Sequence, residues 1–455
     1  MSNDSAQFKS KLGLIAATVG SAVGLGNIWR FPAEVQAGGG AAFLLAYILC
    51  VCLLGIPVMV AEFSLGRAGR TDAIGAFARI TPRRRGWSAV GALSVLTSVL
   101  IAVFYMVVTG WTIEYLWQSI SGNLYSAASA SADEVSYFSA KMNEYVCTDT
   151  LPLAFTLLAV GLNIVVLLGG VSKGIERLSN VLMPLLFVLL LIFCGVALTL
   201  PGAGAGLEFF LKPDFSKFTA TTWLRALGQA FFSLSLGMGI LVTYAGYYPA
   251  KTRLVRTACT VSFLDLLVAV MMGIIIFPSV TAFGLQDHGL AGTTLVFVTL
   301  PEVFMRLPGG PVWSALFFML LSIAALTSTV SITEVATRTL QDRLGLSRRK
   351  AVFALMLPLL VLSGVCALSL GPLSGYTLAG RNMFDFLDFI TADFMLPLAA
   401  MGLCIYMGRV APRKLLQTEM TNHGRDRSRL FRPILFIVRW LAPVLIALVL
   451  ISPLL

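Results

Sequence analysis

Long apolar runs, separated by short polar segments, dominate the pattern along this chain. Of its 455 residues, 57% are hydrophobic and 12% are charged, whereas soluble domains carry about 25% charged residues. A helix that crosses a bilayer needs about 20 apolar residues. The runs therefore predict an all-α integral membrane protein with about eleven membrane-spanning segments, near residues 11–36, 41–66, 87–120, 150–169, 175–200, 222–248, 257–283, 312–340, 350–370, 382–408 and 433–453.

The net charge of +11 would permit a nucleic-acid partner, but the distribution of the charges argues against one. Most of the 33 lysines and arginines fall on segments that would share one side of the membrane with the N-terminus, among them 67–85, 338–350 and 409–439. This asymmetry is the positive-inside pattern. We expect a multi-pass protein of the cell inner (plasma) membrane with a cytoplasmic N-terminus, surrounded by the lipid bilayer and binding no nucleic acid.

Two apolar segments contain glycine-rich interruptions. "GSAVGLGNIWRFP" holds Gly20, Gly24 and Gly26, and "AFFSLSLGMGILVTY" holds Gly237 and Gly239. Such glycines can simply let helices pack closely. Unwound backbone, by contrast, persists in lipid only where its N–H and C=O groups are bound. Because the interruptions lie in the first and sixth segments, they predict two five-helix repeats, each beginning with a discontinuous helix, and a binding site near the middle of the membrane.

Oxygen-bearing side chains accompany these interruptions. Asp265 is a carboxylate within the seventh segment, and an intramembrane acid is by default a candidate functional residue. The hydroxyls of the eighth segment can instead bond to their own helix. Oxygen ligands suit a hard cation such as Na⁺ better than a transition metal. The residues in this group are Asn27, Ser233, Ser235, Asp265, Thr327, Ser328, Thr329 and Ser331.

Five stretches, "GSAVGLGNIWRFP", "GGGAAF", "GIPVMVAEFSLGR", "FFSLSLGMG" and "ALTSTVSI", resemble the neurotransmitter:sodium symporter family, and especially its bacterial amino-acid transporters. The resemblance covers nearly the whole chain. It implies the LeuT fold, a 5+5 inverted repeat with discontinuous helices 1 and 6, and Na⁺-coupled uptake by alternating access. We expect a single transporter domain over 1–455, with repeats at 1–200 and 222–410 and an extra helix at 433–453.

The resemblance also implies two Na⁺ sites. One would use the carbonyl of Ala22, the side chains of Asn27, Ser233 and Asp265, and the carboxylate of the substrate. The other would use the carbonyls of Gly20, Val23 and Ala324 with the hydroxyls of Thr327 and Ser328. Asp265 stands where many relatives have asparagine. Its negative charge would make chloride dispensable.

The same resemblance implies the substrate. Monoamine transporters of the family carry an aspartate where this chain has Gly24, so the glycine leaves room for the carboxylate of an amino acid. The Tyr105 hydroxyl would bind that carboxylate. The remaining pocket is apolar and favours a neutral hydrophobic side chain: leucine, isoleucine, methionine or an aromatic. The expected substrate-binding residues are Ala22, Gly24, Leu25, Gly26, Ile101, Tyr105, Phe232, Ser233, Ser235, Met238, Ser328 and Ile332.

Gates follow from the family pattern as well. Arg30 would pair with Asp388 on the outer side, and Phe232 and Tyr105 would cover the substrate. Tyr247 and Asp342 match the inner gate. Its usual basic partner is absent, because Ser5 stands at that position. Phe8 replaces the usual tryptophan, and Lys9 or Lys11 is the candidate substitute.

Other function classes remain as alternatives. Proton coupling through Asp265 is the nearest, since that carboxylate can carry a proton instead of facing Na⁺. An ion channel is disfavoured by paired broken helices around a closed apolar pocket. An enzyme is not expected, because the apolar segments contain no nucleophile–base pair and no His or Cys cluster for a metal.

Overall fold

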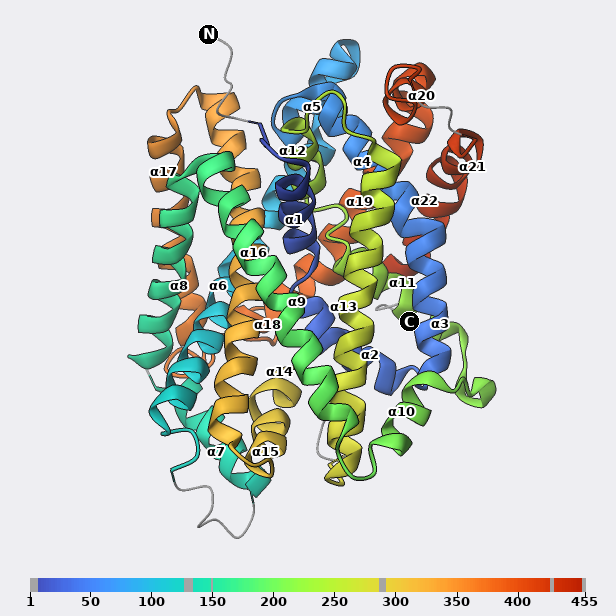
Figure 1. Cartoon of the computed structure of the whole chain (residues 1–455). Helices are drawn as coiled ribbons and strands as arrows, with labels where there is room; N and C mark the ends of the chain where they lie inside the picture. The colour runs from blue at the N-terminus through green and yellow to red at the C-terminus, as the bar shows by residue number, and fades with distance from the viewer. Residues whose placement is uncertain (1–6, 127–133, 149, 286–291, 426–428, 452–455) are drawn as a thin grey trace.

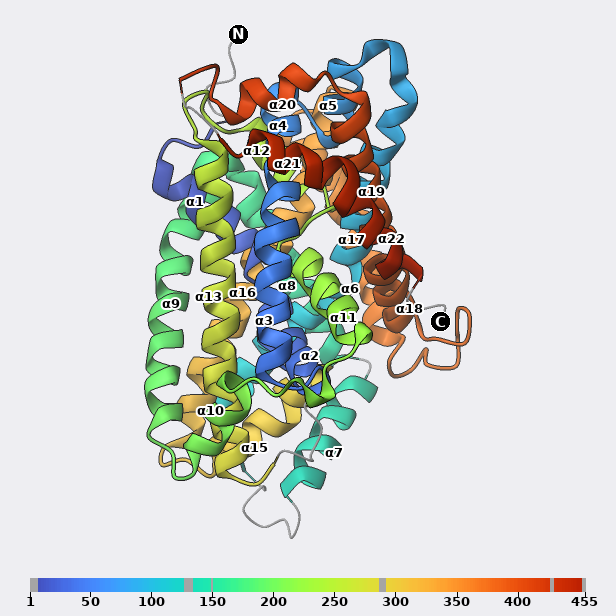
Figure 2. The ribbon, with the colours of Figure 1, turned by 90° about the vertical axis from the view of Figure 1, so that its right-hand side faces the viewer.

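The computed structural model describes residues 7–126, 134–148, 150–285, 292–425 and 429–451. In these ranges the chain is helical, apart from turns and one isolated bridge between Leu378 and Arg381. Figures 1 and 2 show helices running between two ends of the molecule, with α5, α12 and α20 at one end and α7, α10 and α15 at the other. The prediction of an all-helical membrane fold is confirmed.

The helices follow the expected segments in order, with η marking π-helical or 3₁₀ turns. Segments one to five are α1 (Lys11–Ala22), η2 (Gly26–Arg30) and α2 (Phe31–Ala37); α3 (Ala41–Cys50), η3 (Val51–Gly55) and α4 (Ile56–Gly69); α6 (Ser88–Ser121); α8 (Leu151–Leu168); and η6 (Val171–Glu176) with α9 (Arg177–Leu198). Segments six to eleven are α11 (Ala220–Ser233) and α12 (Ile240–Gly246); α13 (Leu254–Ala282); α16 (Gly310–Leu344); α17 (Arg348–Leu368); α18 (Met383–Phe389), η9 (Ile390–Met395), α19 (Leu396–Ile405) and η10 (Tyr406–Val410); and α21 (Phe431–Phe436), η11 (Ile437–Leu441) and α22 (Ala442–Ile451). The connections contain α5 (Ala73–Ile80), η4 (Pro82–Trp87), α7 (Glu134–Cys147), α10 (Ala203–Leu211), η7 (Phe215–Lys217), α14 (Gly292–Thr294), η8 (Leu295–Thr299), α15 (Leu300–Met305) and α20 (Arg413–Met420).

Among the described residues, nine helices are long and apolar enough to cross a membrane, and the bent pair of α1 with η2–α2 makes a tenth. The one remaining expected segment, 222–248, is divided between α11 and α12, which have 14 and 7 residues. Neither is long enough to span alone. The ten candidate spans fall one short of the eleven expected segments because the second helix break divides this one.

The first break lies where the glycines predicted it. Helix α1 ends at Ala22, Val23 is extended, and the chain resumes at a bend of 53°. The side-chain amide N–H of Gln229 donates to the carbonyl oxygen of Gly26 at 2.9 Å. This bond joins the segment after the first break to α11, the helix that precedes the second break. The Gly26 carbonyl also accepts from the Phe31 backbone N–H, so it takes two hydrogen bonds within the protein.

The second break, between α11 and α12, is an unwound segment over 234–239. Gly237 and Gly239 have φ values of 82° and 74°, a left-handed region that glycine occupies without a steric penalty. Glu62 of α4 accepts from the Gly237 backbone N–H at 2.7 Å, and Ser98 of α6 donates to the Met238 carbonyl at 2.5 Å. Ser235 donates to the Ser21 carbonyl at 2.8 Å, which joins the two broken helices.

Candidate functional site

Asn27, Ser233 and Asp265 form a buried polar cluster between the two helix breaks. The Asn27 amide nitrogen donates to Asp265 Oδ1 at 2.9 Å and to Ser233 Oγ at 3.0 Å, and Ser233 Oγ donates to Asp265 Oδ2 at 2.7 Å. The resemblance implied that Asn27 would offer its oxygen to Na⁺. In this structure that oxygen accepts from the Gly24 backbone N–H at 3.3 Å, and the amide N–H groups face the carboxylate. The amide oxygen has a second lone pair, which remains available for a cation.

Tyr47 is a member of this cluster that the sequence interpretation missed. Its hydroxyl lies 3.4 Å from Asp265 Oδ2 and donates to it. Asp265 thus accepts hydrogen bonds from three neutral side chains while it is fully buried. The partners come from three different elements, η2, α3 and α11, so no local pattern indicated that Tyr47 belongs here.

A second cluster of oxygens lies between α1 and α16. Ser328 Oγ is 3.2 Å from the carbonyl oxygens of both Gly20 and Val23. Thr327 Oγ1 is 3.1 Å from the carbonyl oxygen of Ala324. Ser328 thus meets Gly20 and Val23 of the first helix break, and Thr327 packs against Gly20. The Thr327 hydroxyl itself bonds within α16, to the carbonyl oxygens of Ala324 and, at 3.0 Å, Ile323. All the oxygens are hard, neutral donors of the type that suits Na⁺.

A cavity of about 320 Å³ lies beside both clusters. All twelve expected substrate-binding residues line it, together with Arg30 and Asp388. Phe104 and Val108 also line it and were missed, although they lie three and seven residues after Ile101 on α6 and so share its helix face. The other lining residues are Ser21, Trp29, Ala33, Glu34, Gly292, Phe384, Ala392 and Asp393.

Gly24 is tightly enclosed at the cavity wall. A Cβ atom placed on it would lie 2.7 Å from both Ser328 Oγ and the Tyr105 hydroxyl oxygen. The Tyr105 hydroxyl accepts from the Leu25 backbone N–H at 3.1 Å and so holds the chain just past the break. No side chain fits at Gly24 without moving both of these hydroxyls.

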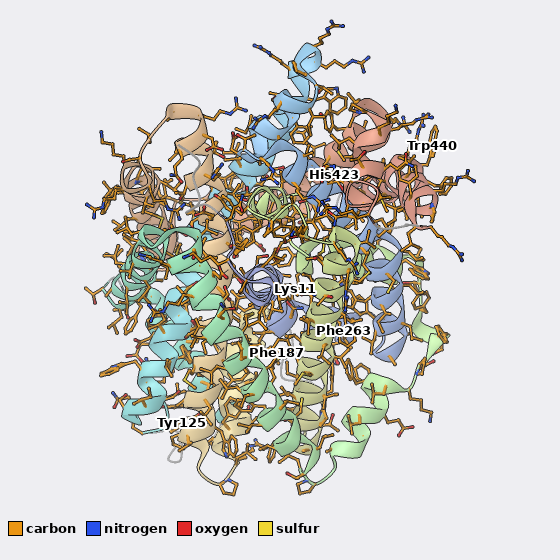
Figure 3. The ribbon with its side chains drawn as sticks, turned by 45° about the horizontal axis from the view of Figure 1, so that its top comes forward. Lys11, Tyr125, Phe187, Phe263, His423 and Trp440 are labelled. Atoms are coloured by element: carbon orange, nitrogen blue, oxygen red, sulfur yellow. The ribbon has the colours of Figure 1, made fainter. Side chains whose placement is uncertain are left out.

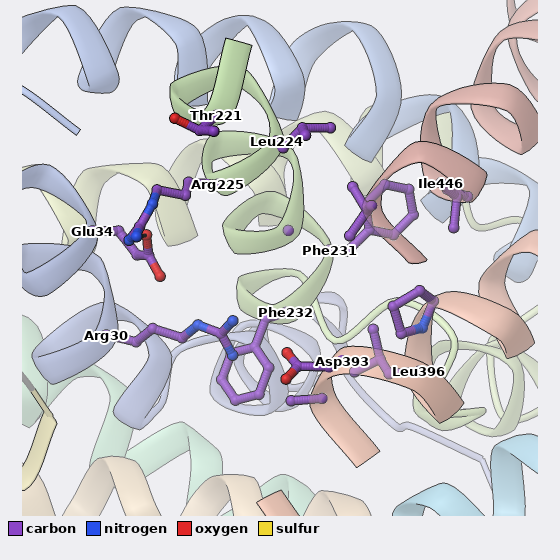
Figure 4. Close-up of a pocket in the computed structure, with 14 residues that line it drawn as sticks. Arg30, Glu34, Thr221, Leu224, Arg225, Phe231, Phe232, Asp393, Leu396 and Ile446 are labelled. Atoms are coloured by element: carbon purple, nitrogen blue, oxygen red, sulfur yellow. Dashed lines mark hydrogen bonds and ion pairs between the residues drawn. The ribbon is translucent and has the colours of Figure 1, made fainter. Parts of the chain in front are cut away.

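The outer gate lacks the ion pair that the resemblance implied. No Arg30–Asp388 ion pair is present in the described structure; the Arg30 guanidinium instead lies 4.6 Å from the centre of the Phe232 ring, a cation–π contact. Asp393, which the sequence interpretation did not select, lines the cavity with Arg30 and Phe232. These three residues also line a second pocket of about 380 Å³, shown in Figure 4, between α2, α11, α19 and α22.

Asp342, expected at the inner gate, is the centre of a polar network. Arg338, one helical turn earlier, forms an ion pair with Asp342 at 2.7 Å. Asp342 Oδ2 also accepts from the Thr71 hydroxyl at 3.0 Å and the Asp72 backbone N–H at 2.9 Å. The i,i+4 spacing of Arg338 and Asp342 was a signal that could have identified this partner.

The expected lysine substitutes do not take that place. Neither Lys9 nor Lys11 pairs with Asp342 in the described part of the chain, and Ser5 lies outside it. Instead, Glu176 of η6 accepts from the backbone N–H groups of Lys9 and Ser10, both at 2.9 Å, and so holds the chain just before α1, whose N-cap is Ser10.

Tyr247, the other inner-gate residue, donates to Glu334 at 2.7 Å, and Arg348 pairs with Glu334 at 2.6 Å. Phe8, which replaces the usual tryptophan, is buried with its ring centre 5.7–6.4 Å from those of Tyr244, Tyr247 and Tyr248. The aromatic contact of the N-terminal segment is therefore retained. Buried Glu334 was not selected from the sequence.

Comparisons with known proteins agree with this arrangement. The family model described as "Sodium:neurotransmitter symporter family" matches residues 5–152 and 139–455. An uncharacterized sodium-dependent transporter, YhdH of Bacillus subtilis (strain 168), is 34% identical over 443 residues, covering 97% of this chain and 96% of its own. An uncharacterized sodium-dependent transporter of Haemophilus influenzae is 35% identical over 426 residues, with 91% and 92% covered. The crystal structure of MhsT in complex with L-phenylalanine aligns with a TM-score of 0.88 and 39% identity, covering 98% of this chain and 99% of that one.

Proposed function

Because the chain belongs to the sodium:neurotransmitter symporter family, we propose that it imports neutral hydrophobic L-amino acids with Na⁺, independently of chloride, across the cell inner membrane. The observation that carries this proposal is the cavity at the two helix breaks, which has oxygen clusters at its edge and apolar side chains over most of the remainder. A discontinuous helix offers N–H groups to a carboxylate and carbonyls to a cation.

Two Na⁺ ions are assigned to the two oxygen clusters. The second cluster would use its carbonyls and hydroxyls, and Ser328 Oγ already lies close to the carbonyl oxygens of Gly20 and Val23. In the first, the Asn27 amide oxygen would be a ligand, and the substrate carboxylate would complete the set. This arrangement couples the two cargoes, because the carboxylate of the amino acid is itself a ligand of the ion.

The substrate class follows from Gly24 and the apolar wall. Tyr105 Oη carries a hydrogen that it can donate to a substrate carboxylate while accepting from Leu25. Ile101, Met238 and Ile332 line the part that would receive the side chain. The bound L-phenylalanine in the MhsT structure supports an aromatic or similarly large apolar substrate.

Chloride independence rests on Asp265. A carboxylate beside the first Na⁺ supplies the negative charge that chloride supplies in other members of the family. Ala269, one turn further along α13, is buried and offers no second charge.

Proton coupling is the second candidate, and the burial of Asp265 among neutral partners favours it, because burial disfavours a lone charged carboxylate. Uptake separates the two candidates. Proteoliposomes with the whole chain would be given labelled leucine, isoleucine, methionine, phenylalanine, glutamate and dopamine, with a Na⁺ gradient or a pH gradient, and with chloride or gluconate. We expect Na⁺-driven uptake of the apolar amino acids in gluconate. Uptake driven by a pH gradient without Na⁺ would instead establish proton coupling, and loss in gluconate would contradict chloride independence.

A further inference from the structure

Two arginines share one tryptophan at the basic end of the last two membrane segments. The guanidinium groups of Arg409 in η10 and Arg439 in η11 lie 4.5 and 5.5 Å from the ring centre of Trp440. Trp440 is half exposed, and Figure 3 shows it at the margin of the molecule. Neither the transport cavity nor either gate involves these residues.

A close helix crossing creates this cluster. A Cβ placed on Gly408 would lie 2.6 Å from the Arg439 Cα, so only glycine lets η10 approach η11 this closely. The Arg409 guanidinium then reaches the Arg439 carbonyl oxygen at 3.4 Å. The two positive charges repel each other, and the close crossing of the two backbones keeps them near one another.

The two positive charges have no acidic partner among the described residues. The ion pairs described for this structure include neither Arg409 nor Arg439, and the Arg439 Nε is buried without a hydrogen-bond partner. Nearby, Arg83 and Arg84 line a shallow recess with Val410, next to Arg409, and add further positive charge. The buried Nε itself is closed to an outside ligand, but Arg409 is exposed and Arg439 is partly exposed, so an anion from outside the protein can reach the two guanidinium groups.

The surface next to the arginines is apolar. Phe436, Trp440, Val444 and Leu448 follow one another at intervals of four, and 48–60% of each residue is exposed. This spacing puts them along one face of the last membrane segment. A dissolved anion would make no favourable contact with this apolar face, whereas the acyl chains of a lipid would cover it.

We propose that Arg409 and Arg439 bind the phosphate of an anionic phospholipid, whose acyl chains lie along the face of Phe436, Trp440, Val444 and Leu448. Basic pockets between membrane helices are suited to anionic head groups, and arginine binds phosphate through two parallel N–H groups. Trp440 holds both guanidinium groups at the level of the head group, where tryptophan is favoured.

Native mass spectrometry of the purified full chain tests this site. Wild type would be titrated with phosphatidylglycerol and with phosphatidylcholine of the same acyl chains. We expect tighter binding of the first phosphatidylglycerol than of phosphatidylcholine, and a loss of about fivefold in Arg409→Gln and again in Arg439→Gln, the contribution typical of one basic residue near a membrane surface. Arg349→Gln is the matched control, because Arg349 is an exposed arginine at the start of α17 with the same charge.

The lipid comparison in wild type needs no variant, so a misfolded mutant does not remove the test. Equal binding of the two lipids by wild type would overturn the proposal. An equal loss in Arg349→Gln would also overturn it, because the effect would then be general surface charge. Displacement of phosphatidylglycerol by millimolar inorganic phosphate would assign the site to free phosphate instead of a lipid. None of these measurements depends on transport.

Discussion

Gly24→Ala tests the site more sharply than removing a single ligand group, because the added methyl group would contact two hydroxyls. The Tyr105 hydroxyl is proposed to bind the substrate carboxylate, and the Ser328 hydroxyl is proposed to bind Na⁺. The added carbon would lie 2.7 Å from Tyr105 Oη and Ser328 Oγ, well inside van der Waals contact. Gly24 does not have the positive φ that would add backbone strain, so the penalty comes from the contacts alone. Overpacking of this kind typically costs about 1–3 kcal/mol.

Because of the neighbouring cavity, we expect this cost to weaken substrate binding rather than folding. Both hydroxyls border open space of about 320 Å³, so they can move into it and leave the fold intact. Their new positions would obstruct the amino acid and distort the second oxygen cluster. We expect little change in thermal unfolding, but a loss of substrate affinity of about 5- to 150-fold, the equivalent of about 1–3 kcal/mol. The Na⁺ concentration for half-maximal binding should also rise.

Equilibrium binding of a labelled amino acid, measured over a range of Na⁺ concentrations, checks this expectation. Gly195→Ala is the control, because a Cβ at that glycine in α9 meets no atom within 4 Å. Adding Tyr105→Phe removes one of the two clashing oxygens, so the double variant should lose less than the sum of the two single losses. Wild-type affinity and wild-type Na⁺ dependence in Gly24→Ala would refute the reasoning.

Three further variants separate the remaining roles. Thr327→Ala combined with Ser328→Ala should raise the Na⁺ needed for substrate binding by at least about tenfold, or about 1.4 kcal/mol, and binding assays that find unchanged Na⁺ dependence would reject the second site. Arg30→Ala should fold normally but transport poorly, because its side chain lies in a cavity and its charge is needed only when the gate closes; wild-type uptake rates would contradict this. Asp265→Asn should weaken Na⁺ binding by removing the charge, with partial recovery in added chloride, whereas an unaltered Na⁺ dependence in the same binding assay would count against Asp265 as a ligand.

Segment positions and both helix breaks could be predicted from the sequence because their causes are local. A run of apolar residues spans a bilayer whatever surrounds it, and Gly237 and Gly239 adopt left-handed conformations because they are glycines. Two misses were local too. Phe104 follows Ile101 at helical spacing, and Arg338 precedes Asp342 by one turn. The assignment of Na⁺ ligands came from family resemblance, and the described geometry brings those residues together without testing the ion.

Long-range partners were decided by the tertiary structure alone. Glu62 bonds to the Gly237 N–H across 175 residues, and Tyr47 reaches Asp265 across 218. Such pairs depend on where helices cross, which no pattern within a segment specifies. Arg30 lies on the ring of Phe232 and forms no ion pair with Asp388 in the described structure. A long side chain contacts whichever partner the packing of several helices puts within its reach, and the residue types alone do not specify that packing.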